Sequence, residues 1–209
     1  MKNKKIIVSI LIMLIPIIFG LLIVNNLPNE LPIHWDINGN IDGYLPKYQA
    51  IIYPNILIIF IQLICVFFIN NDSKNKKQNQ KIINLIYWLL PFISLFFNSI
   101  MYLSVFNVKL NIVNLMVIFF GIIFMIIGNY LPKCLINTTI GIRLPWTLNN
   151  EDVWNKTHRF TGIIWFFSGL ILLVLGIFNL INGIIFICLL MIVIIIPIIY
   201  SYSVYKKLC

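Results

Sequence analysis

Long apolar runs alternate with short polar segments along the whole chain. A helix needs about 20 apolar residues to cross a bilayer, and six runs reach that length. They cover approximately 6–24, 50–69, 83–105, 111–129, 162–180 and 183–203. The pattern therefore predicts an all-α membrane protein with six transmembrane helices.

Two connections between these runs are long, 25–49 and 130–161. In the first, apolar and polar positions alternate around the dipeptides Asn38-Gly39 and Asp42-Gly43, which are typical of turns. A positive φ is expected at Gly43, because glycine adopts it without steric cost. The segment predicts a short hairpin on the membrane surface.

The second long connection contains the signals of a helix start and end. Asn149 can act as N-cap with Asp152 three residues later, and the segment ends in basic residues. Trp154 and His158, four residues apart, share a face. The pattern predicts a short interfacial helix of roughly eleven residues on the connection between the fourth and fifth spans.

Composition supports lipid as the solvent of most of the chain. It has 209 residues, of which 61% are hydrophobic and 10% charged, whereas soluble domains carry about 25% charged residues. The first run follows MKNKK as in a secretory signal. Its length and the lack of an A-x-A-like site favour a retained membrane helix.

The net charge of +9 is distributed as in a membrane protein rather than as a nucleic-acid-binding face. With the N-terminus inside, only Lys47 and Lys109 of the 15 basic residues lie outside. The positive-inside rule therefore predicts cytoplasmic termini, an extracellular loop 25–49 and a cytoplasmic loop 130–161. We expect a multi-pass membrane protein, with no direct nucleic-acid contact.

The predicted spans and loops also suggest a division of the chain into two parts. Residues 1–69 form a two-span unit with the extracellular loop 25–49, and 70–209 form a four-span unit with the inner loop 130–161. We expect both parts to belong to one integral membrane domain.

The spans contain no Asp, Glu, Lys, Arg or His, which argues against a pump or coupled carrier. Gln62 and Asn98 are expected to form hydrogen bonds between helices. Gly162, Gly169 and Gly176 recur every seven residues, so they predict a face on which a neighbouring helix approaches closely.

Few residues suggest catalysis, a cofactor or a metal. His34, Asp36 and Asp42 could form an acid/base or ligand set, but one histidine is poor for zinc. His158 and Glu151 are the other possible acid/base pair, in the inner loop. No H-E-x-x-H motif, which would indicate a zinc-dependent hydrolase, occurs in the sequence. The four cysteines, Cys65, Cys134, Cys188 and Cys209, show no C-x-x-C spacing. We expect no catalytic residue, cofactor, metal or disulfide.

Two stretches carry a family resemblance. GIRLPWTLNNEDVWNKTHRFTG, residues 141–162, resembles the C-terminal signature of the SdpI immunity-protein family of bacterial membrane proteins. LPIHWDINGNIDGYLPK, residues 31–47, resembles the domain of unknown function that opens many members. The order of the two stretches and the six-span layout agree with the family.

The resemblance implies an immunity membrane protein that gives resistance to a secreted SDP-type peptide toxin, which collapses the proton gradient. It also implies a signalling role, in which a cytoplasmic autorepressor is drawn to the membrane. The implied partners are the lipid bilayer, the toxin outside and the repressor inside. A membrane carrier or exporter of a small amphipathic molecule or lipid is the alternative.

Carried over to this sequence, the resemblance gives two sets of candidate residues. The toxin-contact set is His34, Trp35, Asp36, Gly39, Asp42, Gly43 and Lys47. The set for docking a partner or lipid is Arg143, Pro145, Trp146, Thr147, Trp154, Thr157, His158 and Arg159. From the residues alone, the inner set is also consistent with a plain membrane-surface anchor whose basic groups face lipid phosphates.

Overall fold

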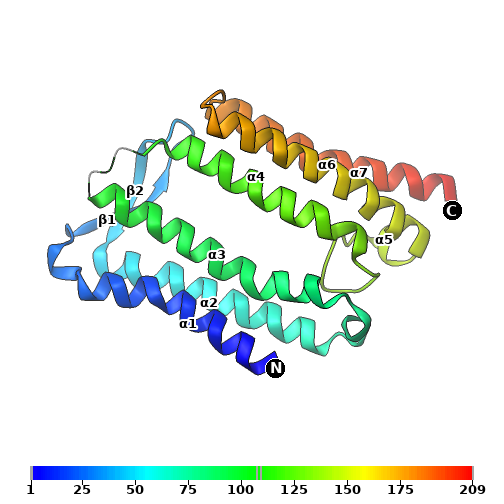
Figure 1. Cartoon of the computed structure of the whole chain (residues 1–209), viewed down its shortest axis with the longest axis horizontal. Coiled ribbons are helices and arrows are strands. Elements are labelled where there is room, and N and C mark those ends of the chain that lie inside the picture. Colours follow the sequence, from blue (N-terminus) through cyan, green and yellow to red (C-terminus); the bar gives the residue numbers. More distant parts are fainter. Residues whose placement is uncertain (1, 107, 109, 209) are drawn as a thin grey trace. The chain divides into compact units, whose positions relative to one another are not determined.

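The computed structural model describes residues 2–106, 108 and 110–208, so Lys109 and Cys209 lie outside the described part. Long helices dominate this part (Figure 1). They are α1 (Lys2–Leu22), α2 (Lys47–Asn71), α3 (Gln80–Val105), α4 (Ile112–Tyr130), α6 (Glu151–Ile177) and α7 (Gly183–Leu208). All six are long and apolar enough to cross a membrane, which confirms the predicted fold class.

Short elements fill the connections. They are η1 (Val24–Asn26), β1 (Glu30–Trp35), β2 (Ile41–Pro46), η2 (Ser73–Lys77), η3 (Leu131–Lys133) and α5 (Pro145–Leu148). Strands β1 and β2 pair antiparallel in one two-stranded sheet, so the predicted hairpin is confirmed. The predicted sidedness of the loops and termini stays a prediction.

The chain divides into two compact units that alternate along the sequence. Unit 1 contains residues 1–71 and 83–112, and unit 2 contains 72–82 and 113–209. The third long helix thus belongs mainly with the first two, whereas the segment before it belongs with the last three. Our division at 69/70 and the single integral domain remain predictions.

Unit 1 has a core where the hairpin meets its helices. Leu31 of β1 is fully buried and packs with Ala50 and Ile51 of α2 and with Met101 and Tyr102 of α3. Leu31 lies outside the predicted spans, so its burial removes it from water and stabilises the fold by about 1.5–3 kcal/mol. The hairpin therefore packs into the same apolar core that α2 and α3 form with each other.

A buried polar network joins α2 to α3 within unit 1. The amides of Asn55 and Asn98 exchange hydrogen bonds of 3.0 and 2.9 Å, and the Ser94 hydroxyl donates to Asn55 Oδ1. Gln62 Nε2 donates to the Tyr87 carbonyl at 3.2 Å. The interhelical hydrogen bonds expected for Gln62 and Asn98 are confirmed.

In unit 2, glycines allow α4 and α6 to pack backbone to backbone. A Cβ on Gly169 would lie 2.6 Å from the carbonyl oxygen of Gly121, and one on Gly162 would lie 2.8 Å from that of Gly128. A Cβ on Gly176 would meet Ile118 at 2.6 Å. The predicted glycine face is confirmed, with α4 as the neighbouring helix.

The separate interfacial helix is not present. Residues 151–161 form the first turns of α6, which continues without a break to Ile177, and the N-cap is Asn150 rather than Asn149. Asn150 Oδ1 accepts from the backbone N–H groups of Asp152 and Val153. Trp154 is fully buried, so its face packs inside unit 2 instead of against lipid.

Cys65, Cys134 and Cys188 are free thiols in the part of the chain that the structure describes. No group of three or more His, Cys, Asp or Glu residues in that part is placed to hold a metal ion.

Candidate functional site

The toxin-contact candidates lie on the β1–β2 hairpin and at the start of α2. His34 and Trp35 lie on β1, Asp42 and Gly43 on β2, and Lys47 is the first residue of α2. Asp36 and Gly39 lie in the turn between the strands, where the Gly39 N–H donates to the Asp36 carbonyl. The structure thus places six of the seven residues on the hairpin and Lys47 directly after it.

Asp36 organises the turn. Its carboxylate accepts the backbone N–H groups of Asn38 and Asn40, each at 2.8 Å, and the Asn40 side-chain amide at 3.1 Å. The Asn40 hydrogen bonds, together with those from the backbone, hold the pKa of Asp36 below its usual value. Gly39 has a φ of 85°, which explains a glycine at this position.

Gly43 has a different role from the one expected. It lies within β2 opposite His34 and does not have a positive φ, so Asp42-Gly43 is not a turn. Its glycine is needed because a Cβ would lie 2.8 Å from the His34 Cβ. This close approach lets His34 Nδ1 and Asp42 Oδ1 pair at 2.5 Å on the exposed side of the hairpin.

We expect Gly43→Val to reduce protection more than Asp36→Asn. The valine must displace the His34 side chain or the strand, whereas the asparagine keeps an oxygen that accepts the turn hydrogen bonds. The check is survival of cells challenged with toxin at matched protein levels. Equal protection by both variants would show that the His34–Gly43 contact does not set the hairpin's shape.

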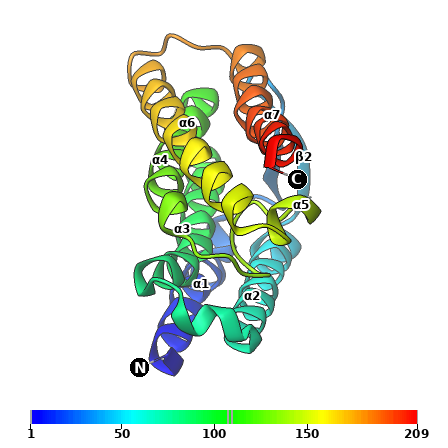
Figure 2. The same cartoon turned by 90° about the vertical axis from the view of Figure 1, so that its right-hand side faces the viewer.

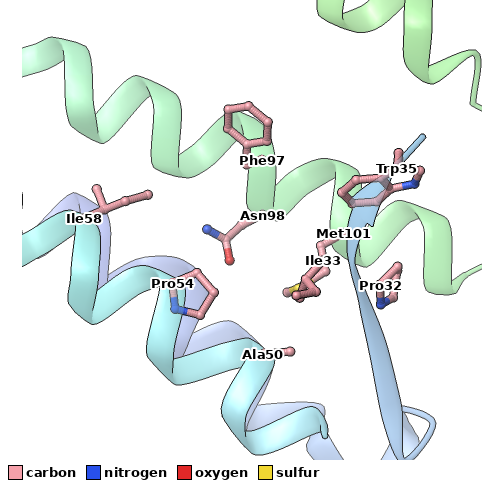
Figure 3. A pocket seen from close by; sticks show the side chains of 9 residues that line it. All are labelled: Pro32, Ile33, Trp35, Ala50, Pro54, Ile58, Phe97, Asn98 and Met101. Carbon is pink, nitrogen blue, oxygen red and sulfur yellow. The ribbon is translucent and has the colours of Figure 1, made fainter. Parts of the chain in front are cut away.

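Below the hairpin, unit 1 contains an apolar pocket (Figure 3). Side chains from β1, α2 and α3 point toward the same hollow, and Asn98 extends from α3 toward α2. The lining residues are Pro32, Ile33, Trp35, Ala50, Pro54, Ile58, Phe97, Asn98 and Met101. The sequence identified Trp35 as a site residue and Asn98 as a helix contact. Pro32 and Ile33 belonged to the predicted hairpin, and the remaining lining residues belonged to predicted spans.

The inner candidates surround an irregular loop that Asn137 holds in shape. The Asn137 side chain is fully buried and accepts the N–H groups of Thr139 and Ile140 at 2.8 and 2.6 Å. Its amide donates to the carbonyls of Leu135 and Ile140. One side chain therefore satisfies four backbone groups of the loop, as a buried irregular segment requires.

His158 and Trp154 close the loop from the α6 side. Trp154 Nε1 donates to the Cys134 carbonyl at 2.8 Å, and the two rings stack with centroids 3.9 Å apart. His158 Nε2 accepts the Ile142 N–H at 3.0 Å, and Nδ1 lies 2.8 Å from the Trp154 carbonyl. A carbonyl can only accept, so the ring is neutral with its proton on Nδ1.

The docking candidates divide into buried and exposed groups. Thr147, Trp154, Thr157 and His158 are buried and support the loop from inside. Arg143, Pro145 and Arg159 are exposed and Trp146 is half-buried. Only the second group is available to a partner or to lipid, because a buried side chain cannot contact either without a rearrangement.

Helix α5 lies beside α7 (Figure 2), and Trp146 of α5 makes contacts that join the two helices. Its Nε1 donates to Ser201 Oγ at 3.0 Å, and its ring lies 5.3 Å from that of Tyr202 and 6.4 Å from that of Tyr205. The Lys206 ammonium lies 5.0 Å from the Tyr202 ring centroid. The sequence did not indicate that Trp146, Tyr202 and Tyr205 would come together near the end of α7. It showed only that Trp and Tyr are residue types common at a membrane interface.

Segment 72–80 is the part of this site that sequence reasoning missed. Gln78 Nε2 donates to the Leu135 carbonyl at 3.1 Å and to Cys134 Sγ at 3.5 Å, and Asn75 Nδ2 donates to Thr139 Oγ1 at 2.6 Å. Burial raises the pKa of the Cys134 thiol to about 11. The thiol is therefore protonated at neutral pH and acts as a packing group.

Asp72 provides the charged contact of the same segment. Its Oδ2 accepts from the Thr138 N–H and hydroxyl at 3.0 and 2.8 Å, and Oδ1 accepts the Lys74 N–H. Partial burial raises the pKa of Asp72, but the Thr138 and Lys74 hydrogen bonds lower it more, so it lies below its usual value.

A carboxylate whose pKa is lower in the folded state than in the unfolded state stabilises the fold at pH values above its unfolded pKa of about 4. This contribution disappears as the pH falls through the folded-state pKa. We therefore expect acid to loosen the 72–80 contact and Asp72→Asn to remove that part of the pH dependence. The check is the unfolding midpoint of detergent-solubilised protein against pH, with the exposed Asp152→Asn as control. Identical pH profiles for both variants would contradict the expectation.

Comparison with known proteins identifies the family of the chain. Residues 133–201 match the SdpI/YfhL protein family, and residues 11–58 match a domain of unknown function (DUF1648). The chain is 30% identical over 209 residues to the immunity protein SdpI of Bacillus subtilis (strain 168), covering 98% of both chains. No solved structure matches. The protein, a multi-pass protein of the cell membrane, therefore belongs to the SdpI/YfhL immunity-protein family.

Proposed function

We propose that the protein protects its cell against a secreted peptide toxin of the SDP type, which depolarises the membrane. The observation that carries the proposal is the 30% identity along nearly the full length of a curated immunity protein. Homology of this extent supports an immunity function in general. That the toxin is of the SDP type is the more specific part of the proposal, and the experiment below tests it.

The hairpin is the proposed contact for the toxin. It lies on the predicted extracellular side, and His34 and Asp42 are exposed on it. Asp36 and Gly39 set its turn, and Gly43 sets the spacing of its strands. In this proposal the toxin meets a preformed surface, so little ordering entropy is lost on binding.

The loop around Asn137 is the proposed contact on the cytoplasmic side. Its exposed basic residues, Arg143 and Arg159, suit an acidic group of a repressor protein or a lipid phosphate. The buried residues give this surface a fixed shape. Drawing a repressor to the membrane is the signalling half of the proposed function.

The test of function is protection. Cells of a toxin-sensitive bacterium would express the chain, and a potential-sensitive dye would follow the membrane after the SDP-type peptide is added. Sustained potential with the protein and collapse without it would establish immunity. Collapse in both would reject the toxin class, and a toxin-export assay would then test the carrier alternative.

We expect Arg143→Ala to lower protection without changing membrane insertion. Arg143 is exposed, and only Nη1 is used by the loop, in a 2.7 Å hydrogen bond to the Thr138 carbonyl. The other guanidinium donors are free to face a carboxylate or phosphate partner. The measurement is the potential assay at matched membrane levels, with Lys156→Ala as an exposed basic control. Full protection by Arg143→Ala would remove this residue from the site.

A further inference from the structure

Charge is distributed unevenly between the hairpin and the rest of the protein. Segment 27–47 holds three of the six acidic residues, Glu30, Asp36 and Asp42, but only one of the 15 basic residues, Lys47. The chain as a whole has a net charge of +9. The hairpin is therefore an acidic surface on a strongly basic protein.

The single lysine does little to neutralise that surface. Lys47 Nζ donates to the carbonyls of Val24 and Leu27 at 3.1 and 3.3 Å. Among the described residues, the ion pair of the hairpin is His34–Asp42. Glu30 is exposed at the start of β1, and Asp36 directly follows Trp35. Two acidic groups without an ion pair among the described residues thus stand at the ends of β1, although the Asp36 carboxylate also accepts the hydrogen bonds of the turn.

The apolar pocket lies along the same strand, with Pro32, Ile33 and Trp35 of β1 in its wall. Its cavity volume is about 80 Å³. An apolar cavity of roughly 150 Å³ is large enough for benzene. The pocket beside the hairpin therefore fits a branched aliphatic side chain better than an aromatic ring.

Asn98 does not make this pocket polar. Its Nδ2 donates to Asn55 Oδ1 and to the Ser94 carbonyl, and its Oδ1 accepts from Asn55 Nδ2. Both amide hydrogens are in use, so a polar ligand group would gain little there. A ligand group that enters is selected for being apolar.

We propose that the hairpin and this pocket together form a binding site for a cationic peptide, with a branched aliphatic side chain seated in the pocket and separate basic residues facing Glu30 and Asp36 at the two ends of β1. The inference rests on the proposed immunity function and names the kind of peptide that the hairpin takes. Charge complementarity identifies the occupant, because an acyl chain of the bilayer would gain nothing from the acidic groups.

The pocket is tested by filling it. Ile33 is 39% exposed and lines the pocket, whereas Ile41 on β2 is 36% exposed and does not. Full-length protein in nanodiscs would be titrated with fluorescent SDP-type peptide. Ile33→Phe should weaken binding about tenfold or more, as expected for loss of one buried aliphatic side chain, and Ile41→Phe should not. Ile58→Phe, with Ile56→Phe as control, repeats the test from α2.

The charge is tested separately. Glu30→Gln should weaken binding about two- to threefold, the size of an exposed ion pair, and the difference should vanish at high salt. Glu151→Gln, an exposed acid of α6, is the control. Acetylating the lysines of the peptide should have the same effect as Glu30→Gln on the wild-type protein.

The two measurements separate this inference from the proposed function. Protection with unchanged binding in both pocket-filling variants overturns the pocket and leaves immunity standing. If the binding affinity is unchanged by Glu30→Gln and by salt, yet is lower in Ile33→Phe, the cationic partner is overturned in favour of an uncharged or acyl occupant. No binding to wild-type nanodiscs overturns the inference, whatever the protection assay shows.

Discussion

Replacement of Gly141 by alanine is expected to open the loop around Asn137 and abolish protection. Gly141 has a φ of 109°, where a side chain costs about 1–2 kcal/mol. Its Cβ would also overlap His158 Nε2, the atom that accepts the Ile142 N–H. Overpacking of a buried site costs a further 1–3 kcal/mol, roughly.

Cys134 reports on this opening. The thiol is buried beneath the loop, and its raised pKa makes it unreactive at neutral pH. In protein whose other cysteines are replaced by serine, a maleimide should label Cys134 much faster in Gly141→Ala than in wild type. Gly39→Ala is the control, because Gly39 also has a positive φ but lies in the hairpin turn.

A double variant separates the two causes. Gly141→Ala with His158→Ala removes the overlap with His158 but keeps the backbone strain and the 3.0 Å contact with the Trp154 ring, and it also removes the hydrogen bond to Ile142. Labelling of Gly141→Ala at the wild-type rate would show that the loop tolerates a side chain here, against the expected effect.

Gly169→Val is expected to separate α4 from α6 and to prevent stable assembly of unit 2. The new Cβ would lie 2.6 Å from the Gly121 carbonyl oxygen and 2.7 Å from the Met125 nitrogen. Both atoms belong to backbone, which cannot move without shifting the whole helix. The cost is therefore at or above the upper end of about 1–3 kcal/mol that overpacking usually brings.

The measurement is the fraction of protein recovered as a folded monodisperse species in mild detergent, followed by its unfolding midpoint in increasing SDS. Leu170→Val is the control, because Leu170 is the next residue of the helix and its side chain is exposed. A midpoint for Gly169→Val equal to that of the control would contradict the close packing of the two helices.

Residue order alone predicted the elements whose signals are local. Six apolar runs, the hairpin turn at Asn38-Gly39 and the glycine face of α6 each depend on spacing within one segment. Asn98 and Gln62 were also identified correctly, because an amide in an apolar run has few ways to satisfy its hydrogen bonds other than a neighbouring helix.

The errors have physical reasons. The first turns of α6 carry Glu151, Asp152, Lys156 and Arg159, so hydropathy separates them from the apolar run that follows. The structure buries their other face under the loop, where Trp154 and His158 pack. At Gly43, the sequence indicated a turn because Asp-Gly is typical of one. The structure shows that glycine is needed there because the strand residue His34 lies directly opposite and leaves no room for a Cβ.

The candidate site was predicted less completely than the fold. Asp72, Asn75 and Gln78 contact residues 56 to 66 positions away, and no periodicity links such pairs. The pocket has the same difficulty, since its walls come from one strand and two helices. Only the folded chain shows that half of the inner candidate set is buried support.

The assignment of segment 72–82 to unit 2 has a consequence for dissecting the protein. No single cut yields both units intact, because the chain enters unit 2 for eleven residues and then returns to unit 1. A fragment that starts at Val113 would lose the hydrogen bonds of Asp72 to Thr138 and of Gln78 to Leu135. Splitting the gene between the third and fourth helices would therefore leave the C-terminal piece with an unsupported loop, and supplying the 72–82 peptide in trans would be the way to restore it.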